Sequence, residues 1–271
     1  MNDSNMPKWL STEKPALIGM IHLDPLPGTP RNQNPFEAIR KKALREAEVL
    51  LESGFDALLV ENMGDAPYLP RTVGPEIIAA MTTVTTDIVA LGKPVGVQVL
   101  AGANKAALSV AEVSGAEFVR VEGFAFAHVA DEGWMNGDAG ALLRYRRQIK
   151  SNVAVYCDVQ KKHSAHSVTA DLQLMDWIEG ALFCGADGVV VTGKSTGYAP
   201  DKTALNGMSN VNCPILMGSG ITPQNVSIYS GYANGLIVGS YLKTDGYWQN
   251  SICMDRAKAM RQAVDALGDQ A

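Results

Sequence analysis

The sequence predicts a closed (β/α)8 barrel, or TIM barrel, and three observations lead to this prediction. Eight short runs of apolar and largely β-branched residues recur along the chain, each about as long as a buried strand. Segments with helical periodicity lie between these runs. No linker or shift in composition divides the 271 residues, so we expect one domain over 1–271, with 1–14 as an N-terminal arm or capping segment. A doubly wound open sheet has the same alternation, but the count of eight strands favours the barrel.

The eight predicted strands are apolar on both faces, as parallel strands covered by helices are. They span residues 16–22, 56–62, 94–100, 116–122, 153–158, 187–192, 213–218 and 234–239. In the first helical segment, apolar residues recur at spacings of three and four: Phe36, Ile39, Ala43, Ala47 and Leu50. Three helical segments end in a glycine just before the next strand, which suits the left-handed position after a helix: Gly54, Gly115 and Gly185.

Composition and charge argue against several classes of protein. The formal net charge of -5 gives no electrostatic reason to expect a nucleic-acid partner, which clustered Lys and Arg would bind. No apolar run approaches the roughly 20 residues of a transmembrane helix, and the N-terminus has no apolar signal-peptide core. The four cysteines are widely spaced and form no CxxC motif, which indicates reduced thiols. We therefore expect a cytoplasmic protein without a transmembrane segment.

Functional side chains of such barrels come from the carboxyl ends of the strands, and the first four predicted strands end in polar residues. His22 ends the first strand, where a satisfied core histidine is the alternative interpretation. Glu61 and Asn62 end the second, and a buried carboxylate there is costly unless it is paired, hydrated or metal-bound. Gln98 lies in the third strand. Arg120 lies in the fourth, where its guanidinium can pair with the carboxylates or bind an anionic substrate.

The fifth predicted strand leads into the densest group of reactive side chains. Asp158, Lys162 and His163 supply a base, an amine that can form a Schiff base, and a proton shuttle. We therefore predict catalytic roles for these three residues, together with His22 and Glu61. The neighbouring Lys161 is expected to be a solvated lysine.

The sequence gives only a weak indication of a metal site. Asp158, His163, Glu61 and His22 are suitable ligand types on different strands, but no HxH pair or HExxH motif is present. We therefore predict no cofactor and no metal ligand. A divalent ion that helps to hold a phosphate stays open as an alternative.

Small residues follow the seventh and eighth predicted strands, which is where barrels commonly hold a substrate phosphate. The two segments are Gly218-Ser219-Gly220 and Gly239-Ser240. Glycines let backbone N–H groups approach an anion closely, and each serine adds a hydroxyl donor. Tight turns without a ligand are the alternative, and the recurrence of the pattern on neighbouring strands favours the phosphate.

Two flanking segments support the same site. Thr222 and Pro223 fit the N-cap and first position of a helix, whose N-terminus would point toward the anion. Thr192 and Gly193 begin another Gly/Ser/Thr-rich loop after the sixth strand, for which we predict substrate contact. This loop does not have the spacing of a Walker A motif.

Several motifs together resemble those of the BtpA/SgcQ family: GMIHLDPLPGTP, LLVENMGDAPY, GAEFVRVEG, YCDVQKKHS, GSGITPQNV and GLIVGSYLKTDG. The resemblance runs from about residue 15 to the last predicted helix. It implies a TIM-type barrel with a ribulose-phosphate-binding-like architecture. Its pattern falls on most of the strand-end residues described above. The segment after the third strand departs from the family pattern, so the resemblance does not fix the substrate.

Two functions follow as hypotheses. The first is an enzyme acting on a small phosphorylated metabolite, by acid–base or Schiff-base chemistry of an isomerase, epimerase or lyase. The second is a non-catalytic assembly or regulatory factor, because one named member of the family is linked to photosystem I biogenesis. The gathering of ionisable residues at the strand ends favours the enzyme, since burying them lowers stability without another gain. Barrels often pair through outer helices, so we expect a homo-oligomer.

Overall fold

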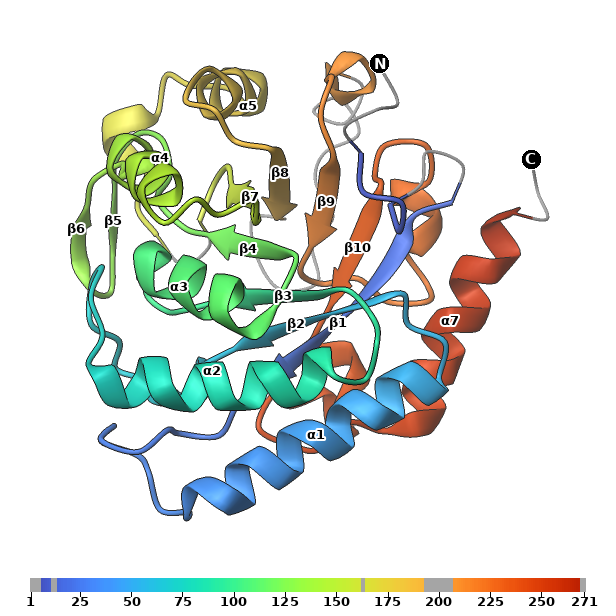
Figure 1. Cartoon of the computed structure of the whole chain (residues 1–271). Helices are drawn as coiled ribbons and strands as arrows, with labels where there is room; N and C mark the ends of the chain where they lie inside the picture. The colour runs from blue at the N-terminus through green and yellow to red at the C-terminus, as the bar shows by residue number, and fades with distance from the viewer. Residues whose placement is uncertain (1–5, 11–13, 162–163, 193–206, 269–271) are drawn as a thin grey trace.

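The protein is a closed barrel of eight parallel strands with helices around it (Figure 1). The computed structural model describes residues 6–10, 14–161, 164–192 and 207–268. Going around the barrel, the strands follow the order β1, β2, β3, β4, β7, β8, β9 and β10, and β10 pairs with β1 to close it. The predicted fold class is therefore confirmed. No helix in these ranges is long and apolar enough to cross a membrane.

Each of the eight predicted runs contains one barrel strand. The strands are β1 (Ala16–His22), β2 (Ala57–Glu61), β3 (Val95–Gln98), β4 (Phe118–Val121), β7 (Ala154–Asp158), β8 (Gly188–Thr192), β9 (Ile215–Gly218) and β10 (Gly235–Val238). Nearly all of their residues are buried, which explains why the runs are apolar on both faces.

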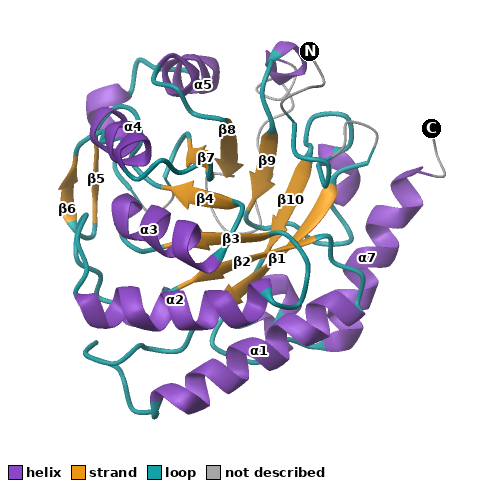
Figure 2. Cartoon of the chain, in the orientation of Figure 1, coloured by secondary structure: helices purple, strands orange, loops and turns teal. Residues whose placement is uncertain are grey.

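The outer layer consists of α-helices and short 3-10 turns (Figure 2). The α-helices are α1 (Phe36–Glu52), α2 (Pro75–Val89), α3 (Asn104–Ser114), α4 (Ala139–Gln148), α5 (Leu174–Phe183) and α7 (Met254–Gly268). The 3-10 helices are η2 (Met63–Asp65), η3 (Ser167–Thr169), η4 (Gly207–Asn210), η5 (Val226–Tyr229), η6 (Ser240–Leu242) and η7 (Thr244–Gly246). Helix α1 buries Ile39, Ala43, Ala47 and Leu50, the apolar stripe seen in its sequence.

The helix expected to begin at Thr222 is absent, and that prediction was wrong. Asn225 accepts a hydrogen bond from the Thr222 backbone N–H at 2.8 Å and donates one to the Gly220 carbonyl at 2.8 Å. The N–H groups of Asn225 and Val226 both donate to the Thr222 carbonyl, so one turn forms, but it continues only as a 3-10 helix. Only the four-residue η5 follows, so the loop after β9 has no helix N-terminus directed at it.

A small hairpin that was not predicted interrupts the alternation between β4 and α4. It consists of β5 (His128–Ala130) and β6 (Gly133–Met135), which pair antiparallel and lie outside the barrel (Figure 1). Gly133 has a φ of 97°, the left-handed conformation that its tight turn requires. The hairpin brings its turn residue Glu132 to the carboxyl end of the barrel, as the contacts of that residue described below establish.

The amino-terminal end of the barrel is closed by apolar packing. Inside the barrel, Phe118 stacks near Tyr156, with ring centroids 5.5 Å apart. The N-terminal segment adds Trp9, whose ring lies 5.4 Å from that of Phe118, and Leu10, which is buried in the same cluster. The interior of the barrel is therefore apolar at this end.

Candidate functional site at the carboxyl end of the barrel

The alternation of side chains along each strand places the predicted site residues at the carboxyl-terminal end of the barrel interior, which we call the barrel mouth. On every barrel strand, the residues that pack in the inner cluster alternate with residues that face the helices. Continuing this alternation to the strand ends gives one inward-facing residue per strand. These residues are His22, Glu61, Gln98, Arg120, Asp158, Thr192, Gly218 and, just after β10, Gly239. The first five carry long polar side chains, whereas the last three are small.

His22 and Glu61 form a buried pair at the ends of β1 and β2. The two residues are partners in the strand register, and His22 Nε2 lies 3.7 Å from Glu61 Oε2. Burial raises the pKa of Glu61 to about 7; Arg120 opposes this rise, and the carboxylates of Glu122 and Asp158 add to it. Burial, with smaller effects of Lys243 and Arg120, lowers the pKa of His22 to about 3. At neutral pH the imidazole is therefore uncharged, while the Glu61 carboxyl exists in both protonation states.

Gly239, in the loop after β10, lies against the His22 ring of this pair. A Cβ atom at this position would lie 3.0 Å from His22 Cε1 and 3.4 Å from His22 Nε2. Glycine at this position lets the backbone approach the His22 ring closely. The acid–base pair and the proposed anion-binding loop thus meet where β10 closes onto β1.

Arg120 and Asp158 form a two-pronged ion pair on the other side of the mouth. Arg120 Nε donates to Asp158 Oδ1 at 2.9 Å, and an Nη of Arg120 donates to Asp158 Oδ2 at 3.0 Å. Both carboxylate oxygens are therefore engaged, in the geometry that suits a guanidinium. This arrangement makes Arg120 the structural partner of Asp158, the first of the two alternatives considered for it.

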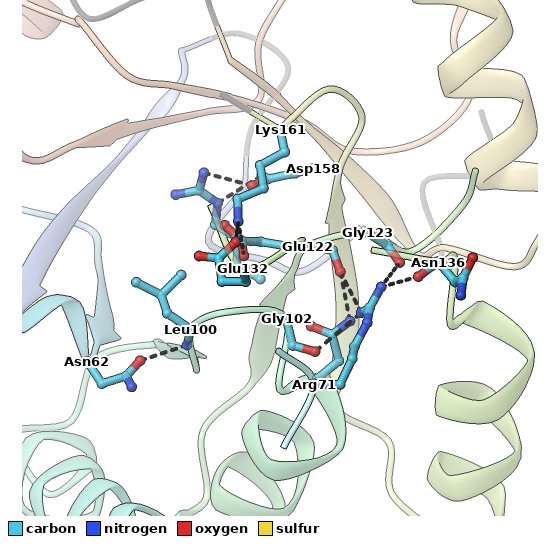
Figure 3. Close-up of polar contacts among 12 residues, drawn as sticks. Asn62, Arg71, Leu100, Gly102, Glu122, Gly123, Glu132, Asn136, Asp158 and Lys161 are labelled. Carbon is cyan, nitrogen blue, oxygen red and sulfur yellow. Dashed lines mark hydrogen bonds and ion pairs between the residues drawn. The ribbon is translucent and has the colours of Figure 1, made fainter. Parts of the chain in front are cut away.

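Lys161 is held between two carboxylates, so the expectation that it is solvated was wrong. Its Nζ lies 3.4 Å from Glu122 Oε2 and 3.3 Å from Glu132 Oε2, and its side chain is 13% exposed (Figure 3). Burial alone would lower the pKa of Lys161, but the two carboxylates outweigh it and raise the pKa. Lys161 is thus a charged ammonium that ties the hairpin turn to the end of β4.

Arg71 fixes the loops beside this group. Its guanidinium donates to the carbonyl groups of Gly102, Glu122, Gly123 and Asn136, which come from the loops after β3 and β4 and from the end of the hairpin (Figure 3). The Gly123 bond measures 2.9 Å and the Glu122 bond 3.2 Å. The backbone of Glu122 is consequently held in place from the outside, while its carboxylate faces Lys161.

Asn62 connects the loops after the first three strands. Its Oδ1 accepts from the Leu100 N–H at 2.7 Å, and its Nδ2 donates to Asp65 Oδ2 at 2.8 Å. Asp65 Oδ1 in turn accepts from the Leu26 N–H at 2.8 Å. Both ends of the Asn62 amide are engaged in this bracket, so the structure places it as a support for the loops.

The loops after β9 and β10 lie side by side. Gly218 pairs with Ile237 in the strand register, so both loops leave the barrel at the same edge. Ser219 and Gly220 have φ values of 71° and 69°, a left-handed pair that is uncommon for serine. Outside the strand ladders, the backbone N–H groups of Ser219, Gly220, Gly239 and Ser240 donate to no carbonyl group of the described residues. Phosphate binding by these amides stays a prediction.

The remaining predicted residues fall into two groups. Thr192 faces the mouth and donates its hydroxyl to the Gln160 carbonyl at 3.0 Å. Lys162, His163 and Gly193 lie outside the described residues. Across the ranges that the structure covers, no group of three or more His, Cys, Asp or Glu side chains is placed to hold a metal ion.

Comparison with models of protein families identifies the family of this chain. The model described as BtpA family matches residues 12–266, which is nearly the whole chain. The chain belongs to the BtpA family. A Caenorhabditis elegans relative, an uncharacterized protein named as mitochondrial, is 42% identical over 268 residues, covering 96% of each chain. The photosystem I biogenesis protein BtpA of Synechocystis is 36% identical over 253 residues, covering 92% of this chain and 87% of its own.

Solved structures of similar fold are far more distant in sequence. Thiamine phosphate pyrophosphorylase of Pyrococcus furiosus aligns with a TM-score of 0.57 at 13% identity, covering 94% of this chain and 98% of the other. N-(5'-phosphoribosyl)anthranilate isomerase of the same organism aligns with a TM-score of 0.56 at 11% identity, covering 93% and 99%. At these identities the likeness establishes the shared barrel fold of this BtpA-family chain and nothing finer.

Three residues of the mouth were not among the predicted site residues: Arg71, Glu122 and Glu132. Glu122 follows Arg120 by two positions, so strand alternation alone would have placed both on the inner side. Glu132 and Arg71 gave no comparable signal, because each reaches the site from a loop or hairpin whose position depends on the folded BtpA-family barrel. The cytoplasmic location and the homo-oligomer stay predictions.

Proposed function

We propose that this protein is an enzyme that acts on a small phosphorylated metabolite, such as a sugar phosphate, by proton transfer at the carboxyl end of the barrel. The observation that carries the proposal is the buried pair of His22 and Glu61 against Gly239, beside backbone amides that are open to an anion. A proton-transfer group and an anion site are the two parts that an isomerase or epimerase of a phosphorylated substrate needs.

Glu61 is the best candidate for the general base among the described carboxylates. Its pKa of about 7 gives comparable amounts of acid and base at neutral pH, which suits a group that both removes and returns a proton. Asp158 is less suited, because Arg120 occupies both of its oxygens. The uncharged imidazole of His22 can donate a hydrogen bond to a carbonyl oxygen of the substrate as charge develops there.

The Schiff-base alternative depends on Lys162. Lys161 is unsuited to attack a carbonyl group, because its raised pKa keeps the amine protonated between Glu122 and Glu132. Borohydride trapping therefore distinguishes the two chemistries: an imine would be trapped in the wild-type protein and lost in Lys162→Met.

The phosphate end of the substrate is assigned to the loops after β9 and β10. Open amides on Ser219, Gly220, Gly239 and Ser240 support this assignment. Two structural neighbours support it too, because each is named for a phosphorylated compound. They are a thiamine phosphate pyrophosphorylase and an N-(5'-phosphoribosyl)anthranilate isomerase.

Calorimetric titration with inorganic phosphate and a panel of sugar phosphates tests the proposal. We expect binding by the wild-type protein and loss of at least about tenfold in affinity in Gly239→Asp and Ser219→Asp, because each places a negative charge at the amides. Ser219→Asp keeps the argument testable if Gly239→Asp misfolds against His22. Thr83→Asp adds the same charge to the outside of α2 and should bind like the wild type. Unchanged affinity in both site variants, or no binding of any phosphorylated compound, would refute the enzyme proposal.

One observation favours a non-catalytic assembly or regulatory role as the second candidate. Val129 and Trp134 face each other across the β5–β6 hairpin, and they are 40% and 54% exposed. An exposed apolar pair is typical of a contact surface, and the Synechocystis relative is named for photosystem I biogenesis. Affinity capture with wild-type protein and Trp134→Ser tests this role. A specific partner lost in the variant supports it, whereas turnover of a sugar phosphate without any partner contradicts it.

A further inference from the structure

Within the part of the barrel mouth that the structure describes, two buried oxygen atoms accept no hydrogen bond of normal geometry. They are Gln98 Oε1 and Glu122 Oε2, on residues that are 2% and 6% exposed. Buried polar atoms are nearly always paired in folded proteins, because an unpaired one costs about 1–3 kcal/mol. Gln98 is the register partner of Glu61, and Glu122 follows Arg120 by two positions, so both face the inside of the mouth.

The carboxylate of Glu122 is held in position without any ligand. Its backbone carbonyl accepts a hydrogen bond from Arg71 at 3.2 Å (Figure 3). It accepts a second one from Asn104 Nδ2 at 2.9 Å. Lys161 Nζ lies 3.4 Å from Glu122 Oε2, close enough for an ion pair but without the geometry of a hydrogen bond. Apart from this ion pair, Glu122 Oε2 has no donor among the described residues, so it can still accept a hydrogen bond from a bound molecule.

Charge decides which kind of donor fits. Four carboxyl groups surround this part of the mouth: Glu61, Glu122, Glu132 and Asp158. The two cations described among them, Arg120 and Lys161, are already paired with carboxylates. A second anionic group of the ligand would meet acceptors and an excess of carboxyl groups over cations here. A hydroxyl group meets neither obstacle and donates the missing hydrogen bond.

We infer that the end of the ligand remote from its phosphate is an uncharged chain bearing hydroxyl groups, which donate to Gln98 and Glu122, and is not a carboxylate. This inference rests on the proposed function and narrows it. Glu122, absent from the sequence-based set of site residues, becomes a residue that determines specificity. Gln98 takes the same role from the neighbouring strand.

Matched pairs of ligands test the inference, since in each pair the aldehyde carbon of the sugar, free or engaged in a ring hemiacetal, is replaced by a carboxylate. Suitable pairs are erythrose 4-phosphate with 4-phosphoerythronate, ribose 5-phosphate with 5-phosphoribonate, and glucose 6-phosphate with 6-phosphogluconate. We expect the sugar phosphate of the best-bound pair to bind at least about tenfold more tightly than its acid, the difference that one disfavoured polar contact produces. Glu122→Gln removes the charge and should reduce this ratio to about threefold or less, with unchanged affinity for inorganic phosphate.

Glu112→Gln, an exposed change of the same chemistry on α3, is the matched control and should leave the ratio unaltered. Gln98→Met provides a second test that does not depend on Glu122: it should weaken the sugar phosphate about tenfold and leave inorganic phosphate unaffected. The inference is overturned if the acid binds as tightly as the sugar phosphate, or if the ratio survives in Glu122→Gln. In those cases phosphate binding still stands, whereas absence of any phosphate binding removes the proposed function as well.

Discussion

The two ends of the barrel interior are built by the same strands and serve opposite purposes. Toward the amino-terminal end, inward positions hold Phe118 and Tyr156, and Trp9 of the N-terminal segment packs against them. Two residues after Phe118 on the same strand, the inward position holds Arg120, and two residues after Tyr156 it holds Asp158. A step of about 6–7 Å along a strand thus separates a dry apolar layer from a charged one.

The contrast indicates where stability and chemistry reside. The apolar layer stabilises the fold through burial and close packing. The charged layer includes a carboxyl group, Glu61, whose ionisation is opposed by its own surroundings. If this division holds, truncations in the apolar layer should lower stability and leave ligand binding intact, whereas removing the Glu61 charge from the charged layer should raise stability.

The largest effect is expected in the apolar layer. Phe118→Ala removes a ring that contacts both Trp9 and Tyr156, so we expect a loss of about 3–5 kcal/mol in the free energy of unfolding. Urea denaturation measures this loss, and the affinity of the folded variant for inorganic phosphate should stay within about twofold. Val113→Ala, an exposed position on α3, should change stability by less than about 0.5 kcal/mol. A large loss of phosphate affinity in Phe118→Ala would break the comparison.

In the charged layer, we expect a substitution that raises the free energy of unfolding. Because the pKa of Glu61 is about 7 in the folded protein and 4.5 ordinarily, the folded state binds the extra proton between these values, and this group lowers stability as pH rises from about 4.5 to 7. Glu61→Gln should therefore be more stable than the wild type by about 1–3 kcal/mol at pH 8, and the difference should vanish below pH 4.5. Urea denaturation across this range measures it. A variant that is less stable at pH 8 contradicts the assigned pKa.

The smallest expected change in the free energy of unfolding concerns Trp9, at the edge of the apolar layer. Trp9 Nε1 donates to Glu117 Oε2 at 3.1 Å at an exposed position, so Trp9→Phe keeps the aromatic contact and loses only this bond. We expect a loss of about 0.5–1 kcal/mol in the free energy of unfolding. Trp9→Ala, measured beside it, should lose more, because the contact with Phe118 disappears too. Equal losses in the two variants would show that the ring contributes nothing to closing the barrel.

Much of the fold was predictable because buried parallel strands leave a simple record in the sequence. Their apolar runs placed every barrel strand, and the last inward residue of each run gave most of the mouth, including His22, Glu61 and Asp158. The hairpin was not predicted because its strands have three residues each, which is too short to show an alternation of apolar and polar residues. The helix at Thr222 was wrong because a capping residue and a proline mark where a turn begins but not how long it continues, and here only the four-residue η5 follows.

The partnerships within the mouth could not be predicted in the same way. Lys161 and Glu132 are 29 positions apart and meet only because the hairpin turns back toward the strands. Alternation shows that a side chain faces inward, but it does not show which charge lies opposite. That information depends on the paths of the loops, which the sequence specifies only through the complete fold.

Arg71 limits how the loops after β3 and β4 can change in length. One side chain binds the carbonyl groups of loops that are otherwise separate in the chain, so a lengthened or shortened loop after β3 or β4 must still deliver its oxygen atoms to that guanidinium. A side-chain substitution in these loops leaves the carbonyl groups that bind Arg71 in place, whereas a change in loop length displaces them. A redesign of the pocket by loop grafting would have to carry all of these loops together, or none.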